Sequence, residues 1–268
     1  MEKFTFNSKT INYRIKGEGE LIIFLPGNTA TSIVYQPQID FFSKYYLAVS
    51  VDYLGTGKSD RISDIKENWW RFSARQINAL IEHLGYKQAI IVGSSGGAVV
   101  AMFLAADFPE KVSYLILDSF SVKFTNEMLE NNVIRERSNP NDAQKQFWTY
   151  CHGNDWKSII KQDTENMKRM VENGGCWLED APQRVKCPVL LLGSREDNFI
   201  PNIEQDFKLL TSQISDCRFA LSDKGSHPLI WTNTTFFNVE VLKFLNSKER
   251  NLKVRQDNLL YKEWQGKC

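Results

Sequence analysis

The chain begins with two short segments in which apolar and polar residues alternate, at residues 3–7 and 10–17. A period of two is typical of strands, because successive side chains of a strand point to opposite faces of a sheet. Further along, five short runs are almost entirely apolar, at residues 21–27, 45–52, 88–93, 112–118 and 187–193. Continuous apolar runs favour buried parallel strands, which helices cover on both faces. The pattern therefore predicts an opening hairpin followed by a buried parallel sheet.

Segments with helical spacing of apolar residues separate these runs. They lie at residues 34–43, 68–85, 98–109, 202–210 and 234–245, and one further short strand is expected at 217–221. Strands that alternate with helices predict an α/β fold with a doubly wound, mostly parallel sheet and right-handed crossovers. We expect this core to take in residues 1–120 and 187–247.

The alternation fails between Ser121 and Lys186, where polar and aromatic residues carry a broadly helical pattern. We interpret residues 121–186 as a small helical insertion into the core. The last stretch, residues 248–268, is charged with two apolar patches, and we expect a short helix or a frayed tail there.

Composition narrows the class of protein and its partners. The 268 residues are 42% hydrophobic and 24% charged, and 33 basic residues balance 32 acidic ones. A net charge of +1 gives no general attraction to nucleic acid or to an anionic membrane, so a small-molecule ligand is expected instead. No apolar run reaches the roughly 18 residues of a membrane span, and the N-terminus lacks the apolar stretch of a signal peptide. The five cysteines show no CxxC spacing, which favours free thiols and a cytoplasmic location over disulfides or a zinc site.

Two serines stand where an apolar run gives way to a helical pattern, in the sequence Gly-Ser-Ser-Gly-Gly at residues 93–97. The pattern G-x-S-x-G fits in one register only, with Ser95 at its centre, because centring on Ser94 would put Val92 at a glycine position. A serine on such a strand-to-helix turn has its hydroxyl exposed above the sheet, so Ser95 is the candidate nucleophile. A dinucleotide-binding turn is the less favoured alternative, because its glycine spacing differs and it belongs at the first strand-to-helix junction.

A serine needs a base, and histidine suits neutral pH. Of the three histidines, His83 lies in a predicted surface helix, where a structural or solvated role is expected. His152 lies in the helical insertion, where a solvated or pocket-lining role is expected. His227 lies in a Gly-Ser-rich loop after the last predicted strand, at the same edge of the sheet as Ser95. We therefore predict His227 as the base. Cys151, beside His152, is disfavoured as an alternative nucleophile, because neighbours in sequence do not face each other on regular structure.

Two aspartates follow buried strands and could orient this histidine. Asp197 comes after the run that ends at Gly193 and gives the chain order Ser, Asp, His that this motif class uses. Asp118 ends the preceding run and stays the alternative acid. We favour Asp197, because its strand lies next in sequence before the strand that leads to His227.

A tetrahedral oxyanion needs two fixed N–H donors. The N–H of Gly96, directly after the candidate nucleophile, is expected to be one of them. The second is expected from the loop after the first buried run, with Asn28 as the candidate and Thr29 less favoured. 

With these motifs in order, the chain resembles the α/β-hydrolase superfamily over nearly its whole length. The motifs are LPGN, DYLGTGKSD, VGSSGG, GSREDNFIP and KGSHP. The resemblance implies that the turn at 52–59 is structural, that residues 121–186 form a helical lid, and that no metal or organic cofactor is needed. One departure is Pro26-Gly27, where many relatives have His-Gly, but the expected donor lies downstream of it.

We therefore expect a serine hydrolase that cleaves a small or medium carboxylic ester, lactone or thioester. A ligand sensor or regulatory binding protein with slow turnover, and a C–C hydrolase or perhydrolase that uses the same triad, are the alternatives, because fold alone does not fix function. An apolar acyl or aromatic pocket is expected under the lid, although the same aromatic side chains could simply pack the lid onto the core. They are Phe120, Trp148, Tyr150, Trp156, Trp177 and Trp231.

Overall fold

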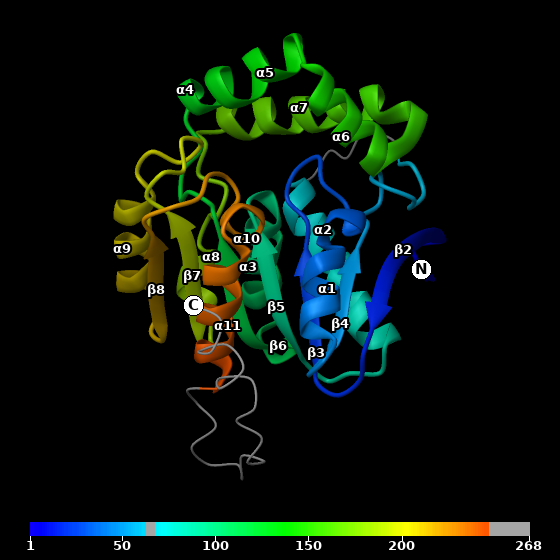
Figure 1. The fold of residues 1–268 in the computed structure, drawn as a ribbon, viewed down its shortest axis with the longest axis vertical. Helices are drawn as coiled ribbons and strands as arrows, with labels where there is room; N and C mark the ends of the chain where they lie inside the picture. Colours follow the sequence, from blue (N-terminus) through cyan, green and yellow to red (C-terminus); the bar gives the residue numbers. More distant parts are fainter. Residues whose placement is uncertain (63–67, 247–268) are drawn as a thin grey trace.

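A computed structural model describes residues 1–62 and 68–246 of the chain and shows one eight-stranded sheet (Figure 1). The strand order is β1-β2-β4-β3-β5-β6-β7-β8. The first two strands and the β2–β4 pair run antiparallel, and all other pairs are parallel. The predicted α/β class with a mostly parallel sheet is confirmed. The strands are β1 (Glu2–Phe6), β2 (Lys9–Lys16), β3 (Leu21–Leu25), β4 (Leu47–Val51), β5 (Ala89–Ser94), β6 (Val112–Asp118), β7 (Val189–Ser194) and β8 (Cys217–Ser222).

The apolar runs form the centre of the sheet because both of its faces are covered. Along β3, Leu21, Ile23 and Leu25 enter one hydrophobic core, while Ile22 and Phe24 enter the other. Every residue of β3 is buried, as are all residues of β5 and β7. A strand with two covered faces cannot show polar alternation, which explains the continuous runs in the sequence.

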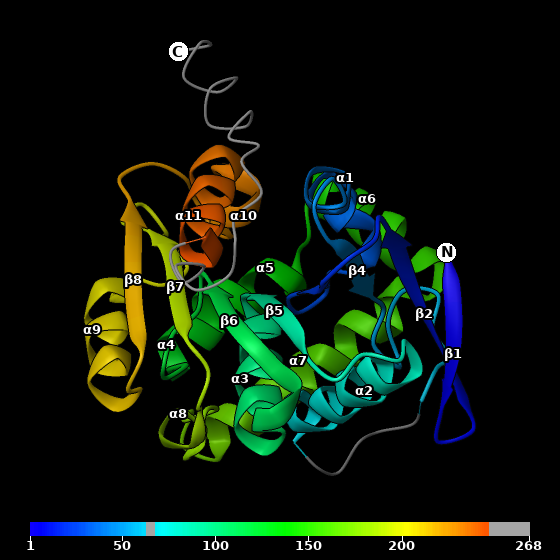
Figure 2. The same ribbon diagram turned by 90° about the horizontal axis from the view of Figure 1, so that it is seen from below.

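Helices lie on both sides of the sheet, as the view from below shows (Figure 2). On one side α2 (Trp69–His83), α3 (Gly96–Asp107) and α9 (Ile203–Gln213) contribute to the larger core. On the other side, α1 (Gln36–Phe42), α10 (Leu229–Thr232) and α11 (Thr234–Asn246) contribute to the second core. No helix of the described residues is long and apolar enough to cross a membrane.

A run of helices interrupts the alternation between β6 and β7. Its members are α4 (Asn126–Leu129), η3 (Glu130–Ile134), α5 (Arg135–Ser138), α6 (Asp142–His152), η4 (Gly153–Asp155), α7 (Trp156–Glu172) and α8 (Ala181–Arg184). Two short 3-10 helices lie outside this run, η1 (Ser32–Tyr35) and η2 (Pro109–Lys111). Helices α4 to α7 lie beyond one end of the sheet, whereas α8 packs against α3 beside it (Figure 1). We call residues 121–186 the helical segment. The expected tail at residues 248–268 lies outside the described residues.

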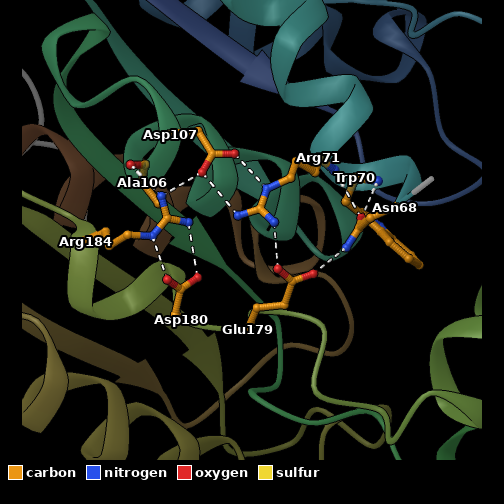
Figure 3. Close-up of polar contacts among 8 residues, drawn as sticks. All are labelled: Asn68, Trp70, Arg71, Ala106, Asp107, Glu179, Asp180 and Arg184. Carbon is orange, nitrogen blue, oxygen red and sulfur yellow. Dashed lines mark hydrogen bonds and ion pairs between the residues drawn. The ribbon is translucent and has the colours of Figure 1, made fainter.

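Ion pairs anchor the returning end of the helical segment to the core (Figure 3). Asp107, at the end of α3, binds Arg71 of α2 at 2.8 Å and Arg184 of α8 at 2.8 Å. Arg71 also binds Glu179, and Arg184 also binds Asp180 at 3.1 Å. Burial raises the pKa of Asp107, but the hydrogen bonds and charges of the two arginines outweigh it and lower the pKa overall. Asp107 therefore connects α3 to both α2 and α8 through ion pairs.

Replacing Asp107 should lower stability. Asp107→Asn leaves two partly buried guanidinium groups without their shared carboxylate, at a cost between that of an exposed and a buried pair, about 1–2 kcal/mol. For a chain of this size the melting temperature should fall by about 2–4 °C. Asp180→Asn is the matched control, because Asp180 pairs with the same Arg184 from a side chain that is 69% exposed. Equal melting temperatures of the two variants in calorimetry would contradict the role of Asp107.

Candidate active site

Ser95 stands on the sharp turn between β5 and α3. Its backbone has φ 54° and ψ −124°, a region that residues other than glycine rarely occupy. The N–H of Ser95 donates to the carbonyl of Asp118 at 2.8 Å, and the N–H of Ala98 donates back to the carbonyl of Ser95 at 2.9 Å. These bonds hold the strained residue between strand and helix, with its side chain at the carboxyl end of the sheet.

Glycines flank the turn because backbones pass close to each other there. A Cβ on Gly93 would overlap the carbonyl of Gly97, and a Cβ on Gly97 would overlap the carbonyl of Leu25 at the end of β3. A Cβ on Gly27 would lie 3.0 Å from both the Ser94 carbonyl oxygen and the Ser95 Cβ. The turn and the loop after β3 are therefore packed against each other at backbone distance.

His227 reaches Ser95 from the loop between β8 and α10. Its Nε2 lies 2.9 Å from Ser95 Oγ, and its Nδ1 lies 2.9 Å from Asp197 Oδ2. A carboxylate only accepts, so the neutral ring carries its hydrogen on Nδ1 and leaves Nε2 free to accept from the serine hydroxyl. The Phe199 ring stacks on the imidazole with centroids 4.5 Å apart, which fixes the plane of the ring. The structure thus brings together the three residues that the sequence nominated.

The two candidate acids occupy different places. Asp197 is buried in the loop after β7, and its second oxygen accepts the Phe199 N–H at 2.9 Å. Asp118 is fully buried and accepts from Ser94 Oγ at 2.9 Å, Ser119 Oγ at 3.1 Å and the Ile230 N–H at 3.2 Å. Burial raises the pKa of Asp118 to about 7, although these hydrogen bonds act against the rise. Only Asp197 is hydrogen-bonded to the imidazole, and Asp118 instead supports the backbone beneath it.

The two expected oxyanion donors lie side by side. A Cβ on Gly96 would lie 3.1 Å from the Asn28 nitrogen and would overlap the Asn28 side-chain oxygen. That oxygen accepts from Trp70 Nε1 at 3.2 Å, and Asn28 Nδ2 contacts the Met167 sulfur at 3.1 Å. Trp70 and Met167 carry no sequence signal for such a role, because they reach Asn28 only through the tertiary fold.

Thr29 and the remaining histidines have structural neighbours. Thr29 has φ 62°, and its carbonyl bonds to His152 Nε2 at 3.0 Å. His152 is buried rather than solvated, with an exposed fraction of 4%. His83 stacks on Phe4, with centroids 5.2 Å apart, on the outer side of α2.

Among the expected pocket aromatics, five pack against other rings. Trp148 contacts Trp156 at 5.3 Å and Phe120 contacts Phe207 at 5.8 Å, as ring-centroid distances. Trp177 packs on Trp70 and Phe124, and Trp231 packs on Tyr35 and Phe147. Tyr150 is 61% exposed. A small pocket beside the site is lined instead by the loop after β3, by the start of α2 and by α7, including Gly27, Thr29, Trp69, Gln162, Asp163 and Asn166.

Comparisons with known proteins agree with the fold. The family model for the alpha/beta hydrolase fold matches residues 20–146. The chain is 25% identical over 256 residues to the serine hydrolase BPHL of Mus musculus, covering 91% of this chain and 85% of that protein. It is 25% identical to 2-hydroxy-6-oxo-6-phenylhexa-2,4-dienoate hydrolase of Comamonas testosteroni, covering 89% and 92%. The enol-lactonase from Burkholderia xenovorans has a similar structure, with a TM-score of 0.71, 17% identity and coverage of 91% and 100%.

The mostly parallel sheet, the strand-to-helix turn and these matches define an α/β-hydrolase fold. The chain has this fold, and the family match together with the named hydrolase relatives identifies it as a hydrolase.

The surroundings of Cys151 predict an unreactive thiol. Burial raises the pKa of Cys151 to about 11, so the thiolate needed for nucleophilic attack is scarce near neutral pH. Iodoacetamide at about pH 8 should alkylate the exposed Cys176 at least tenfold faster than Cys151 in the folded protein. Peptide mass spectrometry over time measures both rates, and unfolding in guanidinium should make them equal. Comparable rates in the folded protein would restore Cys151 as a candidate nucleophile.

Proposed function

We propose that the chain is a serine hydrolase that cleaves a small or medium carboxylic ester, lactone or thioester through Ser95, His227 and Asp197. The observation that carries this proposal is the continuous chain of two 2.9 Å contacts from Asp197 through His227 to Ser95. Each member has the chemistry of its role: a carboxylate that accepts, an imidazole in one tautomer, and a hydroxyl held on a strained turn.

In the first half of the reaction, Ser95 Oγ attacks the carbonyl carbon while His227 Nε2 takes the hydroxyl proton. Asp197 stabilises the imidazolium that forms and keeps the ring oriented. The tetrahedral intermediate collapses, its C–O or C–S bond breaks, and His227 returns the proton to the departing oxygen or sulfur. Ser95 is then acylated.

In the second half, His227 takes a proton from water as the water oxygen attacks the acyl carbon. Collapse of this second intermediate breaks the bond to Ser95, His227 returns the proton to Ser95 Oγ, and a carboxylic acid is released. In both halves the negative oxygen is stabilised by the N–H groups of Asn28 and Gly96, which lie next to each other in the turn region.

The helical segment is proposed to act as a lid. Helices α4 to α7 lie beyond the carboxyl ends of the strands, where open α/β sheets bind ligands (Figure 1). Contacts from α7 to Asn28 support this placement. A cytoplasmic location stays a prediction from the cysteine pattern.

C–C bond hydrolysis is the second candidate, because a relative that matches 89% of the chain is named for hydrolysis of a 6-oxo-dienoate. The same triad would serve, with a carbon leaving group in place of oxygen or sulfur. Parallel assays of p-nitrophenyl esters, thioesters, lactones and a vinylogous 1,5-diketone separate these reactions. Saturable ligand binding without turnover in any assay would favour a ligand sensor.

The first test compares the two neighbouring serines. Ser95→Ala should lower kcat for the best ester by about 10⁶-fold, as loss of a serine nucleophile does in other triads. Ser94→Ala is the matched control and should retain far more activity, because Ser94 Oγ donates to Asp118 and does not contact His227. If wild type and Ser95→Ala hydrolyse every ester equally slowly, the serine hydrolase proposal is wrong.

The second test compares the two aspartates. Asp197→Asn should lower kcat by about 10⁴-fold, because an amide cannot hold the same histidine tautomer. Asp118→Asn should have a smaller effect on kcat and a larger one on melting temperature, since Asp118 accepts three buried hydrogen bonds. The reverse ranking of kcat values would assign the acid to Asp118.

A further inference from the structure

The loop that carries Asn28 makes a tight turn with an unfavourable residue in it. The N–H of Ala30 donates to the carbonyl of Gly27 at 3.1 Å, which closes the turn. Thr29 sits inside it at φ 62°, in the left-handed region that β-branched residues avoid. The Asn28 N–H therefore depends on a backbone conformation that something else must stabilise.

His152 supplies a contact from the helical segment to this turn. Its Nδ1 accepts the N–H of Gly57 at 3.1 Å, and its Nε2 lies 3.0 Å from the carbonyl oxygen of Thr29. Because a backbone N–H only donates and a carbonyl only accepts, the ring is neutral and carries its hydrogen on Nε2. One imidazole thus spans two loops in a single tautomer.

The loop that contains Gly57 is itself held by hydrogen bonds to Asp52. Asp52 accepts the N–H groups of Lys58 and Ser32, both at 2.8 Å, one from each loop. The Ser59 hydroxyl donates to the Asp52 carbonyl at 2.6 Å and receives the Asn12 N–H at 2.8 Å. Gly57 is therefore a fixed anchor, and His152 ties Thr29 to it.

The helical segment is fastened at the same place by further contacts. Arg61 binds Asp155 at 2.6 Å and donates to the carbonyl of His152 at 3.3 Å. The Asn28 amide contacts Met167 of α7 at 3.1 Å. Two consecutive residues of the turn, Asn28 and Thr29, are thus held by side chains from the helical segment.

We propose that His152 is a positioning residue for the oxyanion hole: when the helical segment is docked, its Nε2–H fixes the Thr29 carbonyl and thereby the direction of the Asn28 N–H. The inference rests on the proposed serine hydrolase function. It makes the helical segment part of the catalytic geometry as well as a cover over it. Undocking of α6 would leave Thr29 free to relax.

Burial keeps the imidazole ring of His152 neutral. Burial lowers the pKa of His152 and Arg61 lowers it further, whereas the Thr29 carbonyl, Asp52 and Asp163 raise it but do not compensate. Protonation would place a second N–H on Nδ1, facing the N–H of Gly57, and would break that bond. Acid therefore opposes the docked arrangement.

Two substitutions of His152 test the roles of its two ring nitrogens separately. An asparagine side chain places its oxygen where His152 Nδ1 accepts from Gly57, but it is too short to reach Thr29. A glutamine side chain is long enough to donate an N–H to the Thr29 carbonyl, as His152 Nε2 does. His152→Asn should lower kcat for the best ester at least tenfold with little change in KM, because the hole acts on the transition state. His152→Gln should keep kcat within about threefold of wild type.

His83→Asn is the matched control, because His83 is an exposed histidine that packs on Phe4 and does not contact the turn. It should leave kcat unchanged. The rate at which a fluorophosphonate labels Ser95 should fall in His152→Asn in parallel with kcat, since the phosphoryl oxygen needs the same donors. An unchanged kcat in His152→Asn, or an equal loss in His152→Asn and His152→Gln, would overturn the proposal.

A measurement on His152→Gln does not depend on the folding of the Asn variant. The unfolded chain takes up a proton on His152 near its usual pKa of about 6.5, and the folded protein does so only at lower pH. Lowering the pH from about 7.5 to 5.5 should therefore reduce the melting temperature of wild type more than that of His152→Gln. Equal reductions would contradict the neutral, bridging imidazole.

These outcomes are distinct from a failure of the proposed function. If wild type hydrolyses none of the esters, the serine hydrolase proposal fails, and with it the premise of this test. If wild type turns over, Ser95→Ala does not, and His152→Asn equals wild type, only the positioning role of His152 is wrong.

Discussion

Three backbone segments of the chain approach one another closely where β3 and β5 end, and the arrangement of the candidate site depends on this contact. Leu25, Gly93 and Gly97 meet at distances that leave no room for a Cβ. This contact forces the chain to turn sharply from strand to helix and places Ser95 in its strained conformation. It also sets the loop after β3 directly beside the N-terminus of α3, so that Asn28 and Gly96 are neighbours. The candidate nucleophile and the candidate oxyanion donors are thus positioned by one packing constraint.

The buried side chain of Asp118 connects the region that follows His227 to the strand-to-helix turn. Asp118 accepts from Ser94 of the turn and from Ile230 at the start of α10, while Ser119 accepts the Leu229 N–H. The loop that carries His227 is therefore bonded to the end of β6, whereas its ring is oriented by Asp197 from the end of β7. Two acids at adjacent strand ends serve separate purposes, one on the backbone and one on the imidazole.

The helical segment adds contacts that the sheet cannot provide. At the carboxyl end of the sheet, one side of the turn that contains Thr29 faces the helical segment. His152 and Met167 meet that side from α6 and α7, and Arg61 with Asp155 fastens the junction between these helices to the core. The polar residues of α7 that face the loop after β3 line the adjoining pocket. Substrate selection and oxyanion geometry would then share one surface.

Local patterns in the sequence sufficed for the architecture, because buried parallel strands and amphipathic helices leave periodic signals that do not depend on distant residues. The glycine register singled out Ser95 over Ser94, and chain order nominated His227 and Asp197, although their catalytic roles remain predictions. Chain order favoured Asp197 over Asp118, but only the tertiary structure showed their different contacts, since both follow buried strands and differ in which donors reach them. Only the tertiary structure showed which residues His152 contacts, because Gly57 and Thr29 lie 95 and 123 positions away from it in the sequence. Contacts across such separations leave no periodic trace, so sequence patterns could not reveal them.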